Sequence, residues 1–394
     1  MHDNPTADGP RRSEPRWVDT RGELDAVIAE LLTVDEYALD TEFHGERTYY
    51  PTLALLQIAW PNGLALIDPL AVDITPLGAV FDTDAVMVVH AGDQDMTILQ
   101  RAIGRLPRRI FDTQIAAGFC GLGTPSLLNL AEKIVRVELA KGDRLTDWTK
   151  RPLSDAQRRY AAGDVEYLLS IADGLRRRLT QSGRLAWAEG ECDERLRRDR
   201  ERPDPRTAWW KIKGHRQLRG KARGVAQEVA AWRELRAEAR DIPTRFVVSD
   251  MALAGIIARA PRTRDDLASI RGIDGRLLRD DVAPEILGAV ERGAALEPDA
   301  LVLAPRDDND RSLGPAVTVI AAWLSQRASE LDLEASVLAS RADLTELVNT
   351  GAGRLASGWR ASLVGEPIEA LLHGRAVLGL TDGGRRLELR SDSR

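Results

Sequence analysis

The stretch YALDTEFHGERTYYPTLALLQIAW (residues 37–60) begins like a short buried strand, yet it carries two carboxylates, Asp40 and Glu42. Side chains alternate between the two faces of a strand, so both acids point one way while Thr41 points the other. Like charges on one face repel each other and are costly to remove from water. A bound divalent cation reverses this penalty, because hard cations prefer carboxylate oxygens. The pair therefore favours a metal site.

A solvated strand end is the alternative explanation for the pair. Acid-x-acid triplets occur elsewhere in the chain, at Asp82/Asp84, Asp93/Asp95, Glu191/Asp193, Asp308/Asp310 and Asp332/Glu334. The triplet alone therefore does not decide between a metal site and a solvated strand end, and the decision depends on the rest of the sequence.

Composition bounds the class of protein. The chain has 394 residues, 43% of them hydrophobic, which is enough for two or three domains with real cores. No apolar run reaches the roughly 18 residues needed to span a membrane, and the N-terminus has no apolar segment typical of a signal peptide. The two cysteines, Cys120 and Cys192, are far apart in the sequence. They predict neither a zinc site nor a disulfide framework, and they favour a reducing cytoplasm.

The net charge of −6 at first argues against a nucleic-acid partner. Local charge matters more than the sum. The segment KIKGHRQLRGKARG (residues 211–224) holds six cations and no acid, namely Lys211, Lys213, Arg216, Arg219, Lys221 and Arg223. This basic segment is either a solvated helix face or a surface that holds phosphates.

The first half of the chain has the pattern of an α/β domain. Helical periodicity is expected at residues 22–32 and 95–103, and strand-like runs are expected at 37–43, 53–60, 64–68, 85–92 and 109–119. The tripeptide Pro61-Asn62-Gly63 predicts a hairpin turn, because Asn and Gly tolerate positive φ. Strands that come first and then alternate with helices indicate a mixed sheet.

The second half of the chain has a helical pattern and no strong strand pattern. A charged, proline-containing segment at residues 191–207 predicts a linker, and helical blocks follow at 207–292 and 313–378. Both blocks contain an apolar stretch with Ala-Trp, then a charged helical face and an aspartate. This weak similarity suggests a duplicated helical module.

Two further segments offer acids that could complete a metal site. In VVHAGDQDMTILQ a strand turns into a helix, which places Asp93 or Asp95 at the helix start. The alternative there is an ordinary N-cap, a position that favours Asp. In LSDAQRRYAAGDVEYLL, Tyr160 and Asp164 are four residues apart and share one helix face. The alternative there is a core tyrosine and a surface aspartate.

Taken in order, these segments resemble the DEDD superfamily of 3′→5′ exonucleases, in the subclass with tyrosine in the third motif. The segments DTEF, TYYP, LALLQIA, HAG, IFDTQIAA, DWTKRPL and RYAAGDVEYL are similar to ribonuclease D. Residues 207–292 resemble an HRDC domain through DIPTRFVVSD, and residues 313–378 resemble a degenerate second one. The resemblance covers nearly all of residues 17–378. It implies an α/β ribonuclease-H-like exonuclease domain with a mixed sheet, followed by two all-α HRDC-type domains.

The expected domain boundaries follow from this resemblance and from the composition. They are a disordered lead-in at 1–15, the exonuclease domain at 16–195, a linker at 196–206, the HRDC domain at 207–292, a linker at 293–312, the second HRDC-like domain at 313–378 and a tail at 379–394.

The resemblance also implies the residues of the site. The catalytic and metal-binding acids would be Asp40, Glu42, Asp95 and Asp164, with Tyr160 orienting the attacking water. Asp93 falls at a variable position of the family motif. Gly163 replaces the usual alanine, which we expect the helix to tolerate, and His44 receives no role. The implied cofactors are two divalent ions, Mg²⁺ or Mn²⁺, which suit phosphodiester hydrolysis.

The expected substrate is RNA with a free 3′ end, in particular tRNA precursors, cleaved to 5′ nucleoside monophosphates. Phe43 and the basic segment are expected to contact RNA, and we expect a cytoplasmic monomer without membrane association. A DNA exonuclease of the same superfamily remains an alternative. A non-catalytic nucleic-acid-binding protein is a second alternative, although the five intact site residues argue against it.

Overall fold

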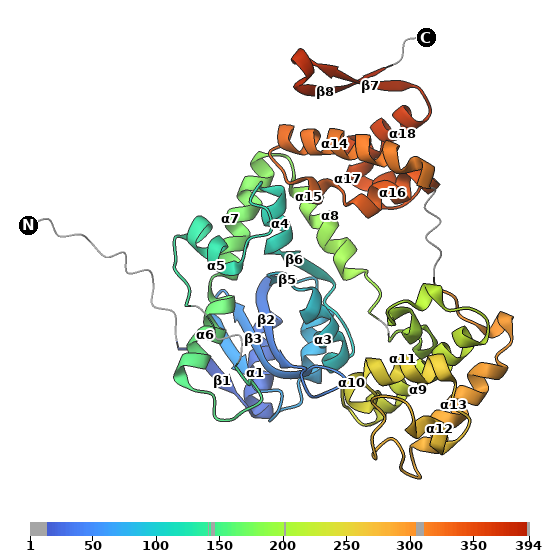
Figure 1. The fold of residues 1–394 in the computed structure, drawn as a ribbon. Coiled ribbons are helices and arrows are strands. Elements are labelled where there is room, and N and C mark those ends of the chain that lie inside the picture. The colour runs from blue at the N-terminus through green and yellow to red at the C-terminus, as the bar shows by residue number, and fades with distance from the viewer. Residues whose placement is uncertain (1–13, 141, 143–145, 201, 305–310, 392–394) are drawn as a thin grey trace, which may run out of the picture. The chain divides into compact units, whose positions relative to one another are not determined.

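The computed structural model describes residues 14–140, 142, 146–200, 202–304 and 311–391. The predicted lead-in lies mostly outside these residues. The chain forms two compact units, one made of residues 1–42, 53–198 and 307–394, the other of residues 43–52 and 199–306. The exonuclease-like sheet belongs to the first unit (Figure 1). None of the described helices is long and apolar enough to cross a membrane.

A six-stranded mixed sheet forms the centre of the first unit. Its strands are β1 (Arg16–Val18), β2 (Glu36–His44), β3 (Thr52–Trp60), β4 (Gly63–Ile67), β5 (Val86–Val89) and β6 (Arg109–Asp112). They lie in the order β1-β4-β3-β2-β5-β6. Strand β3 pairs antiparallel with β4, whereas β2, β5 and β6 run parallel. The mixed sheet predicted from the sequence is confirmed.

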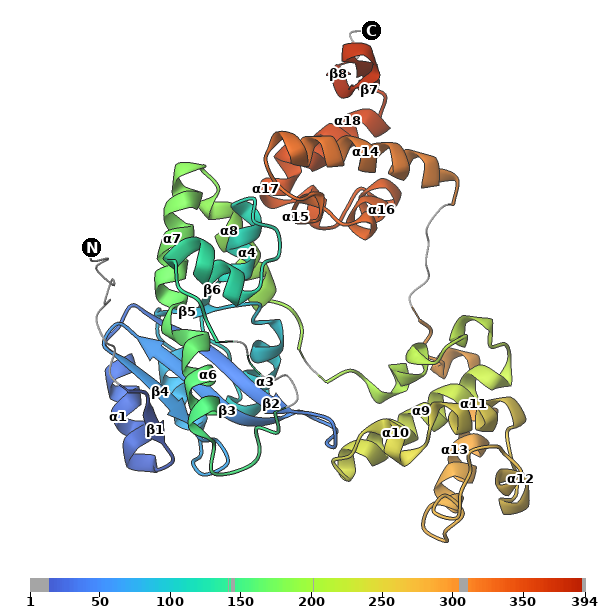
Figure 2. The ribbon, with the colours of Figure 1, turned by 60° about the vertical axis from the view of Figure 1, so that its left-hand side comes forward.

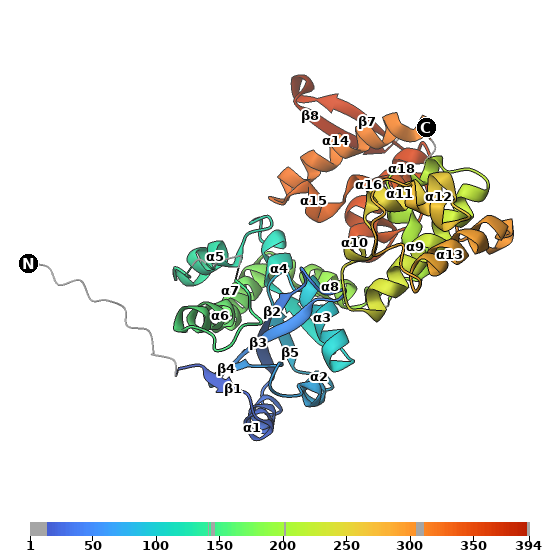
Figure 3. The same cartoon turned by 60° about the horizontal axis from the view of Figure 1, so that its bottom comes forward.

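Helices cover both faces of this sheet. Their bounds are α1 (Arg21–Leu31), α3 (Asp93–Ile103), α4 (Thr113–Phe119), α6 (Asp155–Glu166), α7 (Leu168–Gln181) and α8 (Leu185–Leu196). Helices α6 and α7 pack on one face (Figure 2), where Ala161, Val165 and Ile171 join the sheet residues Ala38 and Val88 in one core. Helices α1 and α3 lie on the other face (Figure 3). Strand β2 thus has α6 on one face of the sheet and α3 on the other.

A turn joins β3 and β4 as expected, but glycine is needed there for a different physical reason. Trp60 pairs with Gly63, so the turn consists of Pro61 and Asn62. Neither Asn62 nor Gly63 has positive φ. A Cβ on Gly63 would lie 2.4 Å from the ring of Trp60. Glycine is needed here for the close approach of an aromatic ring and not for its backbone freedom.

The first unit also contains a helical block near the C-terminal end of the described chain. It contains α14 (Gly314–Glu330), α15 (Ala335–Leu338), α16 (Arg341–Thr350), α17 (Gly358–Arg360) and α18 (Glu366–Leu372) around its own core. The strands β7 (Ala376–Thr381) and β8 (Arg386–Ser391) then form an antiparallel hairpin, which begins at the end of the expected domain 313–378 and continues through the segment expected to be a tail. Gly383 and Gly384, both at positive φ, permit its turn, and Leu378 and Leu389 pack against the helical core.

The second unit is helical apart from the segment 43–52, which includes the last residues of β2. Its main helices are α9 (Lys221–Ala239), α10 (Thr244–Val247), α11 (Asp250–Arg259), α12 (Arg264–Ala268) and α13 (Ala283–Ala295). Helices α9 and α13 approach closely at Gly224 and Gly293, where an added Cβ on Gly224 would lie 2.2 Å from the Gly293 carbonyl oxygen. The segment 43–52 is held against α9, because Tyr49 and Tyr50 donate hydrogen bonds of 2.7 Å to Glu234 and Glu238.

Candidate active site

Three of the predicted acids converge between β2 and α6. One carboxylate oxygen from each of Asp40, Glu42 and Asp164 lies within 4.8 Å of the others. Asp40 and Glu42 project from β2 toward the face covered by α6, as strand alternation requires. This acidic triad, as we call Asp40, Glu42 and Asp164, has the spacing that a single cation could bridge.

Local sequence fixes the helix that carries Asp164. The N-cap Ser154 accepts a hydrogen bond from the backbone of Gln157, whose side chain accepts a bond from the Ser154 backbone. This capping box starts α6 at Asp155. Tyr160 and Asp164 follow at successive turns of one face, next to the buried Ala161 and Val165. The helix is therefore anchored on the sheet, and its polar pair faces the acids of β2.

The acidic triad is electrostatically unfavourable without a counter-charge. Burial, assisted by Asp164 and Asp95, raises the pKa of Glu42 to about 8. Burial raises the pKa of Asp164 to about 7, against a hydrogen bond from Tyr160 that lowers it. The pKa of Asp40 is raised well above its usual range, first by burial and then by the charges of Asp95, Asp164 and Glu42. A bound cation would favour the charged form of every one of these groups.

Asp95 approaches the triad from the other side of β2. Ala38 pairs with Val88, and β5 ends one residue later at Val89, while β2 continues to His44. The start of α3 therefore occupies the space beside β2 where β5 has ended. Asp95 lies there, 8% exposed, and accepts a hydrogen bond from the Thr41 hydroxyl. Asp95 is outside the group of three, yet its charge contributes to the raised pKa of Asp40.

Asp93 occupies a different environment. Its side chain is 46% exposed and pairs with Arg198 at 3.3 Å. Both aspartates thus belong to the first turn of α3, but the structure brings Asp95 toward the triad and Asp93 toward an arginine at the surface.

Tyr160 lies at the edge of the triad. Its ring packs against that of Trp148, with centroids 6.0 Å apart. The Tyr160 pKa is raised by burial and then by the charges of Asp164, Glu42 and Asp40. Its hydroxyl therefore stays protonated at any ordinary pH, so it can orient a water molecule but cannot serve as a base.

The expected RNA-contacting residues fall in the second compact unit. Phe43 is half-buried in the segment 43–52. Lys211, Lys213, Arg216, Arg219 and Lys221 are exposed. Arg223 differs from them, because it is half-buried and its Nε donates to the Leu218 carbonyl at 2.8 Å. Arg219 also donates to backbone carbonyls, those of Arg216 and Leu218. The three lysines are therefore exposed, whereas Arg219 and Arg223 are engaged with backbone carbonyls.

Asp112 is a structural residue of the site that the sequence analysis did not single out. It is fully buried at the end of β6. Its carboxylate accepts bonds from the backbone N–H groups of Ala91 and Gly92 at 3.1 Å each. It also accepts from the N–H groups of Gln114 and Ile115. Asp112 thereby ties the turn before α3 to the N-terminus of α4, which fixes the position of Asp95. The segment IFDTQIAA contained this residue, but hydrogen bonds to groups about 20 residues away leave no local pattern.

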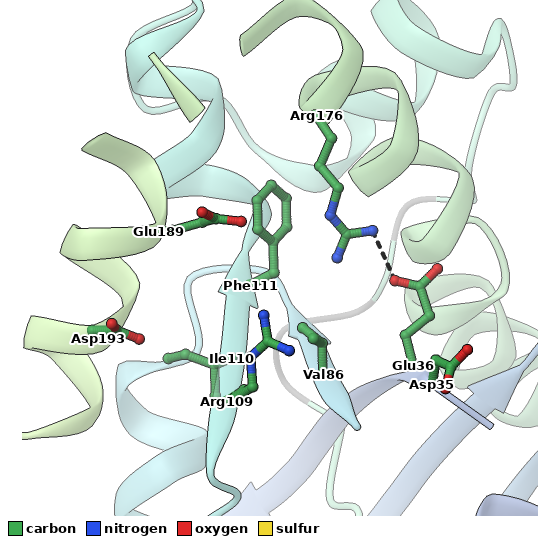
Figure 4. Close-up of a pocket in the computed structure, with 9 residues that line it drawn as sticks. All are labelled: Asp35, Glu36, Val86, Arg109, Ile110, Phe111, Arg176, Glu189 and Asp193. Atoms are coloured by element: carbon green, nitrogen blue, oxygen red, sulfur yellow. Dashed lines mark hydrogen bonds and ion pairs between the residues drawn. The ribbon is translucent and has the colours of Figure 1, made fainter. Parts of the chain in front are cut away.

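A cavity lies apart from these residues, at the amino ends of β2, β5 and β6. It has a volume of about 450 Å³ and is lined by residues such as Glu36, Arg109 and Arg176 (Figure 4). Arg176 pairs with Glu36 at 2.7 Å and lies over the ring of Phe111. None of the predicted catalytic residues lines this cavity, so it is separate from the candidate active site.

The donor set fits hard divalent cations. All four acids offer oxygen ligands, three of them are already within bridging distance, and burial makes their shared negative charge costly. Mg²⁺ and Mn²⁺ prefer such carboxylate ligands. The residues present are thus suited to the metal use that the fold implies.

The chain is similar to known proteins over most of its length. A family model described as 3′-5′ exonuclease matches residues 15–180, and a model of the HRDC domain matches residues 222–290. Ribonuclease D of Zymomonas mobilis is 33% identical over 374 residues, covering 91% of this chain and 94% of that protein. Ribonuclease D of Acidiphilium cryptum is 34% identical over 390 residues, covering 96% and 98%. The crystal structure of Escherichia coli RNase D, described as an exoribonuclease involved in structured RNA processing, matches with a TM-score of 0.82 and 32% identity. That match covers 92% of this chain and 99% of the other.

The fold and the site together define a DEDD-type 3′→5′ exonuclease that carries an HRDC domain. Within that class, the chain belongs to the ribonuclease D family, and it is a 3′→5′ exoribonuclease that acts with divalent metal ions.

Proposed function

We propose that this ribonuclease removes nucleotides from the 3′ ends of tRNA precursors and releases 5′ nucleoside monophosphates. The observation that carries the proposal is the acidic triad, whose three carboxylates lie within 4.8 Å of one another beside Tyr160. Asp40, Glu42, Asp95 and Asp164 would hold two divalent ions, Mg²⁺ or Mn²⁺. When bound, such a pair neutralises charge on both sides of the phosphorus and lowers the pKa of the attacking water.

The residues of the chain would orient this reaction. Asp40 and Glu42 are fixed by β2, and Asp164 is fixed by α6, so their oxygen atoms keep their spacing without help from a loop. Tyr160 stays protonated, and its hydroxyl oxygen would accept a hydrogen bond from the attacking water and hold it in line. A rigid support of this kind preserves the geometry that metal ligands need.

The second compact unit would hold parts of the RNA other than the bond that is cleaved. Phe43 would contact a nucleotide near the 3′ end, and Lys211, Lys213 and Lys221 would contact backbone phosphates. Arg216, Arg219 and Arg223 would add positive charge to the same segment. Phosphate contacts position a substrate without reading its sequence, which suits trimming of different RNAs. A monomer would be sufficient for this activity, because all proposed site residues come from one chain. The proposed location is the cytoplasm.

One experiment tests the substrate and the metal requirement together. The full chain is incubated with a tRNA that carries extra 3′ nucleotides and with a DNA oligonucleotide of matching length, in Mg²⁺, in Mn²⁺ and with a chelator. We expect stepwise shortening of the tRNA with release of 5′ monophosphates, slower attack on DNA, and no cleavage with chelator. Preference for DNA would overturn the RNA assignment, and cleavage in the chelator would overturn the metal mechanism.

A further inference from the structure

Thr41, the residue between the two acids of β2, makes a hydrogen bond that its position in the motif does not predict. It is 5% exposed and points to the face opposite Asp40 and Glu42. Its hydroxyl donates a hydrogen bond to Oδ1 of Asp95, which lies 54 residues further along the chain. The residue that separates two metal-binding candidates on one face thus holds a third candidate on the other.

The location of this bond explains why a side chain is needed there. Strand β5 ends at Val89, so α3 begins beside β2 on an edge where Thr41 has no β5 residue as its partner. Asp112 restrains the turn before α3 through the N–H groups of Ala91 and Gly92, and these bonds act on the backbone and not on the Asp95 carboxylate. Besides backbone N–H groups of Thr41 and of Asp95 itself, the Thr41 hydroxyl is the side-chain group that holds the Asp95 carboxylate.

We propose that Thr41 is a positioning residue for the metal site, fixing Asp95 through Oδ1 so that Oδ2 is presented to a divalent ion. This inference rests on the proposed function of Asp95 as a metal ligand. Groups that hydrogen-bond to a metal ligand orient it, and their loss commonly weakens metal binding by roughly 10- to 100-fold. Asp95 lies outside the acidic triad, so loss of the Thr41 hydroxyl should affect the ion that Asp95 helps to hold.

The competing explanation is that Thr41 merely satisfies its own buried hydroxyl. A buried hydroxyl needs a partner, and the nearest acceptor would serve. The two explanations differ in what Thr41→Val does. If the bond serves only the threonine, then removing its hydroxyl also removes the need, and metal binding stays unchanged. If the bound orientation of Asp95 matters, the affinity for the ion falls.

The test uses the full chain, freed of metal, with Mn²⁺ as the probe in titration calorimetry. Thr41→Val removes the hydroxyl and keeps the shape, whereas Thr41→Ser keeps the hydroxyl and removes the methyl group. We expect Thr41→Val to weaken binding of one Mn²⁺ by about 10-fold or more, in the range found for such residues. Thr41→Ser should bind Mn²⁺ within about twofold of the wild type, because the hydrogen bond that orients the ligand is kept. The Mn²⁺ concentration that gives half-maximal RNA cleavage should shift in parallel.

Each alternative outcome has a clear meaning. Wild-type Mn²⁺ affinity in a folded Thr41→Val protein would overturn the proposal, and so would equal weakening in the serine and valine variants. If the valine variant does not fold, Thr41→Ala compared with Thr41→Ser isolates the hydroxyl, and equal affinities in that pair would overturn the proposal as well. A wild-type protein that binds no divalent ion would instead contradict the proposed function itself.

Discussion

Nη1 of Arg198 donates to both carboxylate oxygens of Asp93, at 3.4 and 3.3 Å, while Asp95, two residues on, is buried beside Thr41. The charge of Asp93 is thus compensated at the surface by the protein itself. The charge of Asp95 is desolvated, and burial raises its pKa. Two aspartates in the same helical turn therefore have different needs for a cation.

This difference predicts a large loss of activity for one of two matched substitutions and a small change for the other. Asp95→Asn keeps the shape but removes a negative charge from the metal site, so we expect the cleavage rate to fall by about 100-fold or more. Asp93→Asn removes a surface ion pair, so we expect a change in rate of less than about threefold. Rates are measured on the same tailed RNA at one Mn²⁺ concentration, with the fold checked by circular dichroism. A larger effect at Asp93 would mean that the motif register is wrong by two residues.

The raised pKa values predict an unusual pH dependence for the metal-free protein. The pKa values of Glu42 and Asp164 are about 8 and about 7 in the folded chain, against ordinary values of 4.5 and 3.8. Between these limits the native state binds more protons than the unfolded state, so the contribution of these groups to stability is present at low pH. It is lost as the pH rises through 7 to 8. Divalent ions should restore it, since they favour the charged carboxylates.

The measurement is urea unfolding in chelator at about pH 6 and about pH 8.5, on either side of the raised pKa values, for the wild type and for Asp164→Asn. Asp164→Asn removes one raised pKa directly, and it also removes a charge that raises the pKa values of Glu42 and Asp40, so the difference between the two proteins reports on the acidic triad. We expect the variant to gain stability relative to the wild type as the pH rises, and added Mg²⁺ to stabilise the wild type more. A wild type that gains on the variant toward the higher pH would contradict the raised pKa values.

Most strands and the helices α1, α3 and α6 could be predicted because their patterns are local, but the strand-like run expected at 109–119 is wrong in its second half, because β6 ends at Asp112 and the chain continues as α4. The run at 37–43 became β2 with one residue added at each end, and Tyr160 and Asp164 share a face because helix geometry requires it. Strand β1 was missed because three residues at a sheet edge carry no periodicity. The hairpin of β7 and β8 was missed because six of its twelve residues are exposed and only Ala376 is buried, so burial leaves little apolar pattern in the sequence.

The parts of the site that were missed depend on interactions between distant segments. Asp112 lies in a segment that resembles the family, IFDTQIAA. Its bonds to the turn at Ala91 and Gly92, however, arise only after β5 and β6 pair. The bond from Thr41 to Asp95 likewise requires that β5 end early beside β2. Motif spacing indicates which residues carry chemistry. The side chains that hold them in place are visible only in the folded chain.

Tyr160→Phe should slow hydrolysis more than it weakens RNA binding. Phenylalanine keeps the packing against Trp148 but removes the hydroxyl that would orient the attacking water. We expect the single-turnover rate to fall by roughly 100-fold, within the usual range for a group that handles or orients a proton, and the RNA dissociation constant to change by less than about threefold. A variant that binds RNA poorly but cleaves bound RNA at the normal rate would assign Tyr160 to substrate grip.

Gly163→Ala should be tolerated in the helix that carries the site. An added Cβ would meet no atom within 4 Å, so the substitution should raise the free energy of unfolding by about 0.5–1 kcal/mol and leave cleavage unchanged. Gly224→Ala is the contrasting variant, because its Cβ would lie 2.2 Å from the Gly293 carbonyl oxygen. Thermal unfolding should show the first variant at or above the wild type and the second below it. A destabilised Gly163→Ala would mean that α6 needs more room than its surroundings show.

The basic segment should hold RNA through backbone phosphates. Lys211, Lys213 and Lys221 are exposed, whereas Arg223 uses its Nε to bind a backbone carbonyl, so the three lysines give the sharper test. Binding to phosphates releases counterions, which makes the logarithm of affinity fall linearly with the logarithm of salt concentration. Changing the three lysines to glutamine should weaken tRNA binding, and it should flatten that slope by roughly one unit for each phosphate that is no longer bound.

A matched control changes Arg262, Arg264 and Arg271 to glutamine. These are also exposed cations of the same helical unit, so the net charge falls by the same amount as in the lysine variant. If only the general attraction between protein and RNA mattered, tRNA binding would weaken equally in both triple variants, whereas specific binding of phosphates would weaken only in the lysine variant. Cleavage of a short oligonucleotide, which occupies only the active site, should stay near the wild-type rate in both. Equal salt slopes and equal tRNA affinities for the two variants would show that the basic segment does not hold the RNA, because lysines that bind phosphates cannot be removed without changing the number of counterions released.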